Sequence, residues 1–288
     1  MTTLIRIAFL STLMLASTPA APAPTPDKLE VYKTVGTTQL QLGIFNPANH
    51  KPSDKSPCIV FFFGGGWVSG TMSQFYPASR YLADRGMVAI CADYRVNSRQ
   101  HVTPFECVQD AKSAMRWVRG HASELGIDPH RIAAGGGSAG GHLAAAAATT
   151  TGFNTPGEDP TVSCRPDALV LFNPVIDNGP GGYGYDRVQA RWQKFSPMNN
   201  LKKGDPPTVL FYGTMDKFVP VTTAQKYQSL MQKNGDRCEL HLYEGEPHGF
   251  FNPSNEGGKY FRLTMLEADK FLASLGYLQG PPRLDLLK

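Results

Sequence analysis

The run Gly135-Gly136-Gly137-Ser138-Ala139-Gly140-Gly141 decides the fold that this sequence predicts. An apolar stretch at residues 131–134 precedes it and a helix-forming stretch at residues 143–148 follows it, so we expect a strand, a sharp turn and a helix. Inside the run, Gly136, Ser138 and Gly140 have the G-x-S-x-G spacing of a nucleophile elbow. Such a turn needs glycines because a Cβ atom beside the serine would clash across it. The alternative is an incidental serine in a glycine-rich turn, and the flanking strand and helix patterns argue against it.

Strand and helix patterns alternate along most of the chain. Two short leading strands are expected at residues 29–32 and 40–44, and apolar runs typical of buried parallel strands follow at residues 58–63, 87–92, 132–134, 168–172, 208–212 and 240–243. Helical patterns lie between them, at residues 76–85, 104–125, 143–149, 220–234 and 259–275. The alternation predicts an α/β fold with a mostly parallel, doubly wound sheet flanked by helices. No linker interrupts residues 29–288, which we expect to form a single catalytic domain without a large cap.

The composition is that of a globular protein. Of the 288 residues, 41% are hydrophobic and 18% are charged, which argues against disorder. The formal net charge of +4 is small and scattered, so we expect no nucleic-acid partner. A basic cluster lies in a stretch that we expect to be a solvated loop, and it consists of Arg187, Arg191, Lys194, Lys202 and Lys203. No cysteine or histidine spacing resembles a zinc site, and we expect neither a metal nor a cofactor.

The first 20 residues have the pattern of a signal peptide. Arg6 supplies a positive charge, residues 7–16 are apolar, and Thr18-Pro19-Ala20 offers small residues for cleavage. The apolar stretch is too short for a stable membrane anchor. Residues 21–28 are rich in proline and alanine and should form a flexible lead-in. We therefore expect a secreted or periplasmic protein.

The five cysteines all follow this leader, and an odd number in an exported protein leaves at least one thiol free. Cys58 and Cys91 lie in expected core strands and should be buried thiols. Cys107, Cys164 and Cys238 could contribute one disulfide, and the sequence leaves its pairing open.

A serine nucleophile needs a histidine base that is oriented by a carboxylate. Where the serine stands on such an elbow, the carboxylate and then the histidine follow it along the chain. His248 lies in a loop just after an expected strand end, where it could reach over Ser138, and Asp216 lies in the loop after the preceding strand. We expect the competing histidines to be structural and the competing aspartates to be solvated; these are His142, His241, Asp205 and Asp236.

The oxyanion of a tetrahedral intermediate needs two or three backbone N–H donors. Ala139, directly after the serine, supplies one, and Gly65 and Gly66, directly after the first long strand, supply the others. Glycines let the backbone approach a carbonyl oxygen without side-chain interference. A phosphate-cradling loop is the other interpretation of this glycine run, and the G-K-[ST] ending that it requires is missing.

Five motifs occur in order within residues 57–275: Phe63-Gly64-Gly65-Gly66-Trp67, Asp93-Tyr94-Arg95, Gly136-Gly137-Ser138-Ala139-Gly140-Gly141-His142, Gly213-x-x-Asp216 and His248-Gly249-Phe250. Together they resemble the α/β-hydrolase esterases, most closely the small bacterial acetyl-esterase or feruloyl-esterase-like members related to the hormone-sensitive lipase group. The resemblance implies a catalytic triad and an oxyanion hole, with Ser138 as nucleophile, Asp216 as acid partner, His248 as base, and Gly65, Gly66 and Ala139 as oxyanion donors.

The chain departs from the family at Phe63, where these esterases usually have a histidine that helps to brace the glycine loop. How this loop is braced here is therefore open. Asp93-Tyr94-Arg95 is expected to be structural, and its charged pair could supply the brace.

The leading hypothesis is a secreted serine carboxylesterase that hydrolyses short-chain esters, with acetyl esters of carbohydrate or other bulky alcohols expected first. No long amphipathic helix that could cover a long acyl chain is expected between residues 172 and 208. Aromatic residues near the motifs could stack on sugar rings or simply pack the loops; they are Trp67, Tyr183, Tyr185, Trp192, Phe195 and Phe250. The alternatives are a serine peptidase or lipase of the same fold, or a non-catalytic ligand-binding relative. The oligomeric state is left open.

Overall fold

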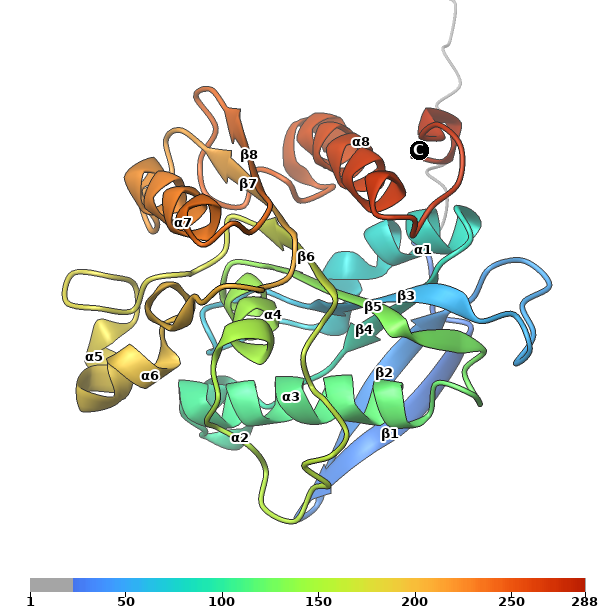
Figure 1. Ribbon diagram of the computed structural model, residues 1–288, viewed down its shortest axis with the longest axis horizontal. Helices are drawn as coiled ribbons and strands as arrows, with labels where there is room; N and C mark the ends of the chain where they lie inside the picture. The colour runs from blue at the N-terminus through green and yellow to red at the C-terminus, as the bar shows by residue number, and fades with distance from the viewer. Residues whose placement is uncertain (1–22, 288) are drawn as a thin grey trace, which may run out of the picture.

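The computed structural model describes residues 23–287, so the expected signal peptide at residues 1–20 lies outside the described part of the chain. One eight-stranded sheet runs through the molecule in the order β1-β2-β4-β3-β5-β6-β7-β8 (Figure 1). The strands are β1 (Lys28–Val35), β2 (Thr38–Phe45), β3 (Ser56–Phe62), β4 (Val88–Ala92), β5 (Ile127–Gly137), β6 (Ala168–Phe172), β7 (Thr208–Gly213) and β8 (Cys238–Tyr243).

The sheet is mostly parallel, as the sequence predicts. Strands β3 to β8 pair with one another in parallel, whereas β1 pairs antiparallel with β2, and β2 pairs antiparallel with β4. Parallel neighbours bring the carboxyl ends of their strands to one edge of the sheet. The loops after β3, β4, β5, β7 and β8 therefore meet there, and these loops carry the motifs identified above.

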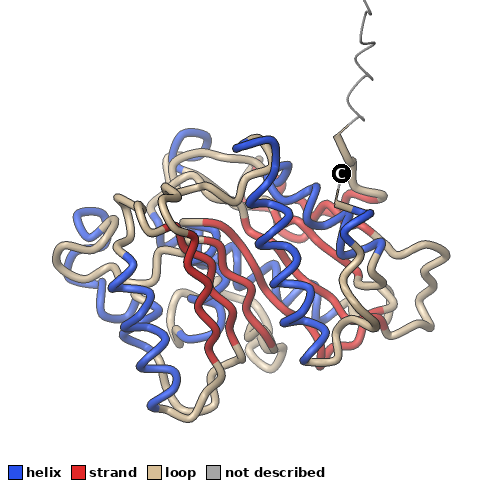
Figure 2. The backbone as a smooth tube through the Cα atoms, turned by 90° about the horizontal axis from the view of Figure 1, so that it is seen from above, coloured by secondary structure: helices blue, strands red, loops and turns tan. Residues whose placement is uncertain are grey.

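Helices cover both faces of the sheet (Figure 2). The longer helices are α1 (Tyr76–Asp84), α3 (Pro104–Gly120), α4 (Ala139–Thr149), α7 (Val221–Lys233) and α8 (Lys259–Ser274). The short ones are α2 (Asn97–Gln100), α5 (Tyr185–Val188), α6 (Trp192–Phe195) and the 3-10 turns η1 (Met72–Phe75), η2 (Gln189–Arg191), η3 (Pro197–Asn200), η4 (Asn255–Gly258) and η5 (Leu284–Leu286). Among the helices of residues 23–287, none has the length and apolarity that crossing a bilayer would require.

Strand β3 shows why the central strands are continuously apolar. Val60 and Phe62 enter the core beneath α3, α4 and α7, while Ile59 and Phe61 enter a second core beneath α1 and α8. All four side chains are at most 1% exposed. Burying a side chain of this size is worth about 1.5–3 kcal/mol, so a strand covered on both faces favours apolar residues at every position.

Helix α3 begins where the sequence predicts and ends earlier. Thr103 caps it in a capping box with Glu106, and Pro104 occupies the first turn. The helix ends at Gly120 rather than at residue 125, because the chain must reverse to enter β5. It does so at Gly126, where φ is +64° and a Cβ atom would lie 2.3 Å from the Lys51 carbonyl oxygen.

The stretch between β6 and β7 contains only short helical turns. The sequence predicts that its basic residues are solvated, but two of them pack against the protein. Arg187 donates to the Gly66 carbonyl oxygen at 2.6 Å and lies over the rings of Trp67 and Tyr183. Arg191 lies 3.9 Å from the ring centroid of Phe105. These guanidinium groups fasten the stretch to the body of the protein through cation–π contacts.

The expected lead-in is attached to the sheet over its described part. The Asp27 N–H donates to the Ile44 carbonyl oxygen at 2.8 Å, and Lys28 already belongs to β1. The five cysteines are all free thiols, so the one possible disulfide among Cys107, Cys164 and Cys238 is absent from the described chain. Cys58 and Cys91 are buried, as expected.

Candidate active site

Ser138 stands on a strained turn between β5 and α4. Its φ of 52° and ψ of −119° are unfavourable for a residue with a Cβ atom, so the surrounding turn must hold it there. A Cβ atom at Gly136 would lie 2.5 Å from the carbonyl carbon of Gly140, and one at Gly140 would lie 2.1 Å from the Phe62 carbonyl oxygen. Both glycines are therefore required by close backbone contacts, which is the physical reason that the sequence motif anticipates.

The structure brings Ser138, His248 and Asp216 into one line of hydrogen bonds. His248 Nε2 lies 2.9 Å from Ser138 Oγ, and His248 Nδ1 lies 2.7 Å from Asp216 Oδ2. The three residues come from the loops after β5, β7 and β8. The arrangement allows the imidazole to accept the serine proton at Nε2 while Nδ1–H donates to the carboxylate.

Asp216 is held by its own loop. Its side chain is fully buried, and Oδ1 accepts the backbone N–H groups of Phe218 at 2.9 Å and Val219 at 3.0 Å. These donors leave Oδ2 for His248 and stabilise the ionised carboxylate. The histidine loop packs directly on this loop, because a Cβ atom at Gly213 would lie 2.1 Å from the Glu246 carbonyl oxygen.

The competing histidines lie elsewhere. His142 is fully buried, with Nε2 3.2 Å from the Phe195 carbonyl oxygen, and burial lowers its pKa to about 3. It therefore stays neutral and packs between the Trp67 and Phe195 rings. His241 lies within β8, 3.8 Å from Glu239.

The competing aspartates also have partners other than the active-site residues. Asp205 is buried, 5% exposed, and pairs with Arg165 at 3.0 Å, which corrects the expectation that it is solvated. Asp236 accepts the backbone N–H groups of Gly204 and Asp205.

The glycine loop after β3 lies beside Ser138. A Cβ atom at Gly64 would lie 3.4 Å from the Ser138 Cβ atom, and Gly65 and Gly66 have φ values of +121° and +63°. Within residues 23–287, the backbone N–H groups of Gly65, Gly66 and Ala139 donate to no protein acceptor. Three amides in these loops are thus available to an oxyanion.

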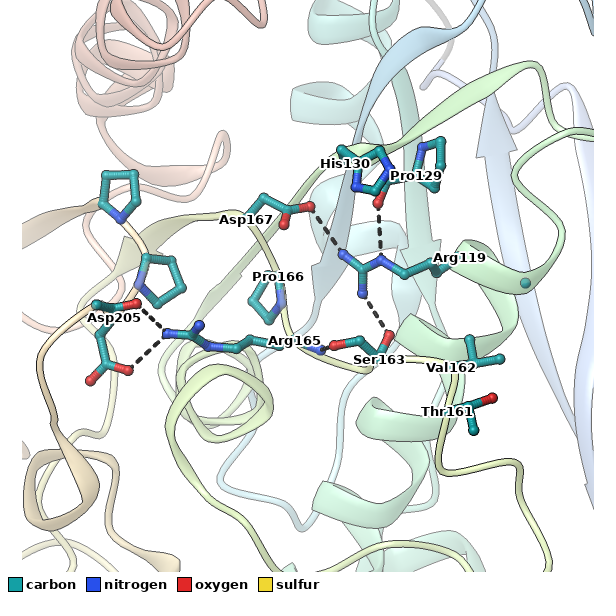
Figure 3. A pocket seen from close by; sticks show the side chains of 14 residues that line it. Arg119, Pro129, His130, Thr161, Val162, Ser163, Arg165, Pro166, Asp167 and Asp205 are labelled. Carbon is teal, nitrogen blue, oxygen red and sulfur yellow. Dashed lines mark hydrogen bonds and ion pairs between the residues drawn. The ribbon is translucent and has the colours of Figure 1, made fainter.

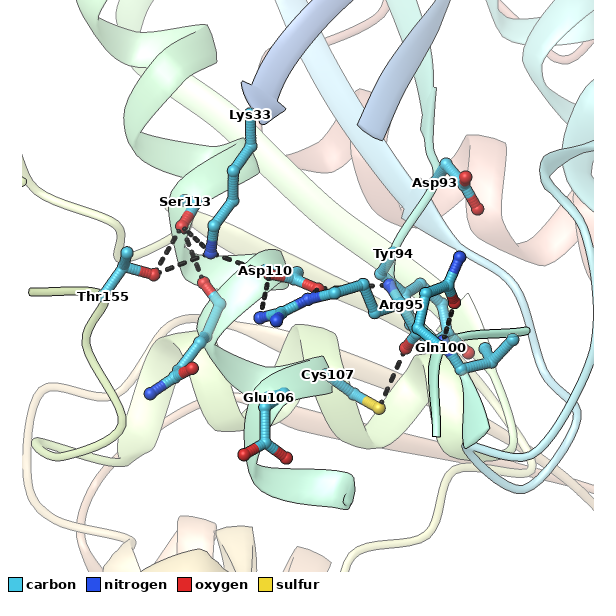
Figure 4. Close-up of polar contacts among 12 residues, drawn as sticks. Lys33, Asp93, Tyr94, Arg95, Gln100, Glu106, Cys107, Asp110, Ser113 and Thr155 are labelled. Carbon is cyan, nitrogen blue, oxygen red and sulfur yellow. Dashed lines mark hydrogen bonds and ion pairs between the residues drawn. The ribbon is translucent and has the colours of Figure 1, made fainter. Parts of the chain in front are cut away.

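The Asp93-Tyr94-Arg95 motif braces this loop through its tyrosine and not through its charged pair. The Tyr94 hydroxyl donates to the Phe63 carbonyl oxygen at 2.7 Å, and the two rings stack with centroids 4.1 Å apart. Arg95 turns away to the buried Asp110, whose other partner is Lys33 (Figure 4). An aromatic stack thus supports the loop at Phe63, the position where a histidine is usual.

Sequence reasoning missed a pair of amide side chains, Gln74 and Asn252, beside the triad. Gln74 Oε1 accepts the Gly64 N–H at 2.6 Å, and Gln74 Nε2 donates to Asn252 Oδ1 at 2.9 Å. Asn252 Nδ2 donates to the Gly249 carbonyl oxygen at 2.7 Å. This amide bridge, Gln74 with Asn252, joins the glycine loop to the histidine loop. Its central contact joins Gln74 and Asn252, which are 178 positions apart, so no local sequence pattern predicts it.

Asn173 supports the histidine loop from the other side. Its Oδ1 accepts the Gly249 N–H at 2.9 Å, which turns its Nδ2 toward His248 Nε2 at 3.3 Å. A donor facing Nε2 favours the tautomer that carries its proton on Nδ1. The only local signal for Asn173 is its place directly after β6, at the edge where the motif-bearing loops meet.

A cavity of about 260 Å³ opens beside Ser138 and His248. The glycine loop, Gln74, Asn173, Tyr183 and Phe218 contribute to its wall. Of the aromatic residues expected near substrate, Tyr183 lines this cavity. Tyr185 and Trp192 lie on α5 and α6 and take no part in its lining.

Trp67 and Phe250 are each 1% exposed, so neither ring offers a face to a substrate. Trp67 packs against His142 and Phe195, and Phe195 is itself fully buried. Phe250 packs against Tyr243 and Tyr260. The expectation of sugar contacts fails at these buried rings because the loops use them as their own core.

A larger hollow of about 650 Å³ lies at the opposite ends of the strands, beside the first residues of β5 and before β6 and β7 (Figure 3). Its arginines are engaged in the fold: Arg119 contacts the Pro129 and Ser163 carbonyl oxygens and the Asp167 carboxylate, and Arg165 pairs with Asp205. Residues 23–287 contain no cluster of three or more His, Cys, Asp or Glu side chains arranged to hold a metal ion. The cavity at Ser138 is therefore the one that we take as the candidate active site.

The chain is similar to several known proteins in sequence and in fold. Residues 42–178 match the BD-FAE family model, and residues 173–271 match that of the dienelactone hydrolase family. The apo form of Thermogutta terrifontis esterase 2 superposes with a TM-score of 0.86 at 45% identity, covering 91% of this chain and 98% of that one. Structures of the same esterase phosphorylated by paraoxon, or with propionate or butyrate bound, give a TM-score of 0.84.

Curated relatives are more distant. A probable isoprenylcysteine alpha-carbonyl methylesterase of Arabidopsis thaliana is 26% identical over 236 residues, which are 72% of this chain and 48% of that protein. The acetylxylan esterase of Xylanibacter ruminicola is 29% identical over 232 residues, which are 73% of this chain and 43% of that protein. The chain thus spans about half the length of the curated relatives that it matches.

Proposed function

Because the chain belongs to the α/β-hydrolase esterases, we propose that it is a carboxylesterase in which Ser138, His248 and Asp216 form the catalytic triad. The observation that carries the proposal is the pair of hydrogen bonds from His248, 2.9 Å to Ser138 Oγ and 2.7 Å to Asp216 Oδ2. A histidine placed between a strained serine and a buried carboxylate can take up and return one proton.

In the first half of the reaction, Ser138 Oγ attacks the ester carbonyl carbon as its proton moves to His248 Nε2. The carbonyl oxygen becomes an oxyanion, which the N–H groups of Gly65, Gly66 and Ala139 stabilise by hydrogen bonds. Asp216 stabilises the imidazolium. The carbon–oxygen bond to the alcohol then breaks, His248 gives its proton to the departing alkoxide, and the acyl group remains on Ser138.

In the second half, water replaces the alcohol. The water oxygen attacks the carbonyl carbon of the acyl-enzyme while His248 accepts a proton from the water. The oxyanion of this second tetrahedral intermediate occupies the same oxyanion hole. The bond to Ser138 Oγ breaks, the proton returns to Ser138, and the carboxylic acid leaves. No group beyond these side chains and backbone amides is needed to balance the steps.

For the substrate, we propose short acyl groups on a sugar or other bulky alcohol. The cavity at Ser138 is small, and no described helix between β6 and β7 exceeds four residues, so little apolar surface is available to cover a long chain. Structures of the T. terrifontis esterase carry propionate and butyrate, and one curated relative is an acetylxylan esterase. Both observations concern those proteins, and they support the proposal of short acyl groups for this chain.

The first experiment is rapid mixing with 4-nitrophenyl acetate. A burst of nitrophenol equal to the enzyme concentration would report the acyl-enzyme and exclude a non-catalytic binding protein. Acetyl and octanoyl esters of one alcohol then test the acyl length, and preference for octanoyl would overturn that part. Acetate release from acetylated xylan tests the carbohydrate part of the proposal. If no acetylated glycan released acetate, the carbohydrate part would be wrong and the esterase proposal would stand.

We also propose that the protein is exported, from the signal-peptide pattern of residues 1–20. Expression of the whole chain, followed by mass spectrometry of the mature N-terminus, tests this. A protein that starts within a few residues of Ala21 in the periplasm or medium would support export. An uncleaved cytoplasmic protein would contradict it.

A further inference from the structure

A second hollow adjoins the cavity at Ser138. Tyr183 and Phe218 line both, and their rings meet edge to face with centroids 5.9 Å apart. This side cavity, of about 240 Å³, is completed by Asp177, Pro180, Gly181, Gly182, Val219, Pro220 and Thr223. Two ring side chains thus form the wall between the cavity at Ser138 and this partly open hollow.

The side cavity lies next to the base. Phe218 belongs to the loop of Asp216, and its ring contacts the His248 ring edge to face with centroids 5.1 Å apart. In the proposed reaction the departing alcohol takes its proton from His248 Nε2, so the alcohol half of the ester is the half that lies beside Phe218. A group attached to that oxygen reaches the side cavity past the Phe218 ring, which is 57% exposed.

The lining of the side cavity suits hydroxyl groups better than an alkyl chain. Asp177 is partly buried, and its Oδ1 accepts the Gly179 N–H at 2.9 Å. No Lys, Arg or His of residues 23–287 forms an ion pair with this carboxylate. A carboxylate without a cation still accepts hydrogen bonds from hydroxyl groups, whereas an alkyl group would only remove its water.

The size fits one sugar ring. At about 30 Å³ for each water molecule, the space corresponds to about eight waters, comparable with the roughly ten heavy atoms of a pentose. The Phe218 ring offers a flat apolar face beside it, which complements the C–H face of a pyranose.

We propose that the side cavity binds a hydroxyl-bearing alcohol group of the ester, with Asp177 accepting its hydroxyl groups and Phe218 packing against its ring. The proposal rests on the esterase function proposed above and gives the alcohol half of the substrate a defined place. Asp177 is then a specificity-determining residue, and it takes no part in bond making.

The test compares two acetyl esters that differ only in the alcohol, xylose monoacetate and ethyl acetate. Loss of a hydrogen bond to a charged acceptor lowers affinity by about tenfold or more, so Asp177→Ala should lower the ratio of kcat/KM for the sugar ester over the ethyl ester by about that factor, mainly through KM. Asp177→Asn, which keeps an acceptor oxygen, should lie between. Asp186→Asn, an exposed carboxylate of the same stretch, is the matched control and should keep the wild-type ratio.

Equal losses on both esters, or an unchanged ratio, would overturn the proposal. So would a larger effect of Asp177→Ala on acetylcholine than on xylose monoacetate, because that result would indicate a cation site. Titration of the Ser138→Ala protein with methyl β-xyloside, followed by NMR, tests the cavity without catalysis. Binding that Asp177→Ala removes would support the side cavity even if the protein hydrolysed neither ester. Absence of binding, or binding that Asp177→Ala leaves unchanged, would overturn the proposal.

Discussion

At the scale of single residues, the backbone of Ser138 positions its side chain before any substrate arrives. Because its strained φ and ψ are enforced by backbone contacts at Gly136 and Gly140, Oγ has little freedom to leave the line of His248 and Asp216. We predict that Ser138→Ala, His248→Ala and Asp216→Asn each lower kcat by about a thousandfold or more, with non-additive double variants. Steady-state kinetics with 4-nitrophenyl acetate measures this.

The control for these variants is His241→Ala, which removes a histidine of the neighbouring strand β8 and should keep the wild-type rate. If His241→Ala lost activity while His248→Ala kept it, the assignment of the base would be wrong. Circular dichroism of each variant would show whether the fold is intact.

A second residue-scale prediction concerns His142. Burial lowers its pKa in the folded protein to about 3, whereas the unfolded chain has the ordinary value of about 6.5, so between these values the unfolded chain binds more protons. The free energy of unfolding should therefore fall as the pH drops through this window, with a slope from this group of at most about 1.4 kcal/mol per pH unit. Urea unfolding between pH 7 and pH 4 measures it.

His142→Gln removes the titrating group and should flatten this part of the pH dependence. His130→Gln, which removes an exposed histidine, is the matched control and should leave the slope as it is. An equal slope in the wild type and in His142→Gln would show that other groups cause the acid destabilisation.

At the scale of elements, the amide bridge holds two loops at a fixed separation. A backbone N–H stands at its Gly64 end and a carbonyl at its Gly249 end, so each side-chain amide has only one useful orientation. We predict that Gln74→Leu lowers kcat about 10- to 100-fold, because it leaves the Gly64 N–H unpaired and lets the oxyanion donors move relative to His248. Kinetics with 4-nitrophenyl acetate, resolving kcat from KM, measures the loss.

Gln74→Glu separates positioning from simple space filling. The glutamate keeps an acceptor for the Gly64 N–H, but its second oxygen faces Asn252 Oδ1, which is also an acceptor. Rotating the Asn252 amide would only move the conflict, because its oxygen would then face the Gly249 carbonyl oxygen. We therefore expect Gln74→Glu to be no more active than Gln74→Leu. Gln228→Leu, whose amide contacts the Cys238 carbonyl oxygen in β8, is the matched control. Wild-type kcat and KM in Gln74→Leu would contradict the role of the bridge.

At the scale of the whole molecule, a buried ion cluster joins the first strand to helix α3 and to the segment after β4 (Figure 4). Asp110 on α3 is fully buried and pairs with Lys33 of β1 and with Arg95 after β4, each at 2.7 Å. We predict that Asp110→Asn lowers the free energy of unfolding by about 3–5 kcal/mol, because two largely buried cations lose their counter-charge. Urea unfolding at pH 7 measures it.

Asp128→Asn breaks a more exposed pair with Arg131 and should cost at most about 1 kcal/mol. Similar losses in the two aspartate variants would show that the buried cluster contributes no more than a surface pair.

Much of the architecture could be read from the chain because its signals are local. All eight strands overlap the segments where the sequence predicts them, six of them marked by apolar runs, and the elbow forms because Gly136 and Gly140 contact each other across one turn. The grouping of Ser138, Asp216 and His248 could also be anticipated, since each follows a strand and parallel strands end at one edge. Their catalytic roles stay a prediction for the kinetics to test.

Contacts between distant segments could not be anticipated, because they depend on how the loops pack. Sequence alone does not distinguish Trp67, buried beneath the loops, from Phe218, exposed beside His248, since both are aromatic residues in glycine- or proline-containing loops. The bridge from Gln74 to Asn252 and the side cavity around Asp177 likewise exist only once separate strands bring their loops together. Hydrophobic periodicity and turn preferences depend on a few neighbouring residues, so the sequence by itself determines them. The partner of a polar side chain depends on which distant segments pack around it, so only the tertiary structure determines that partner.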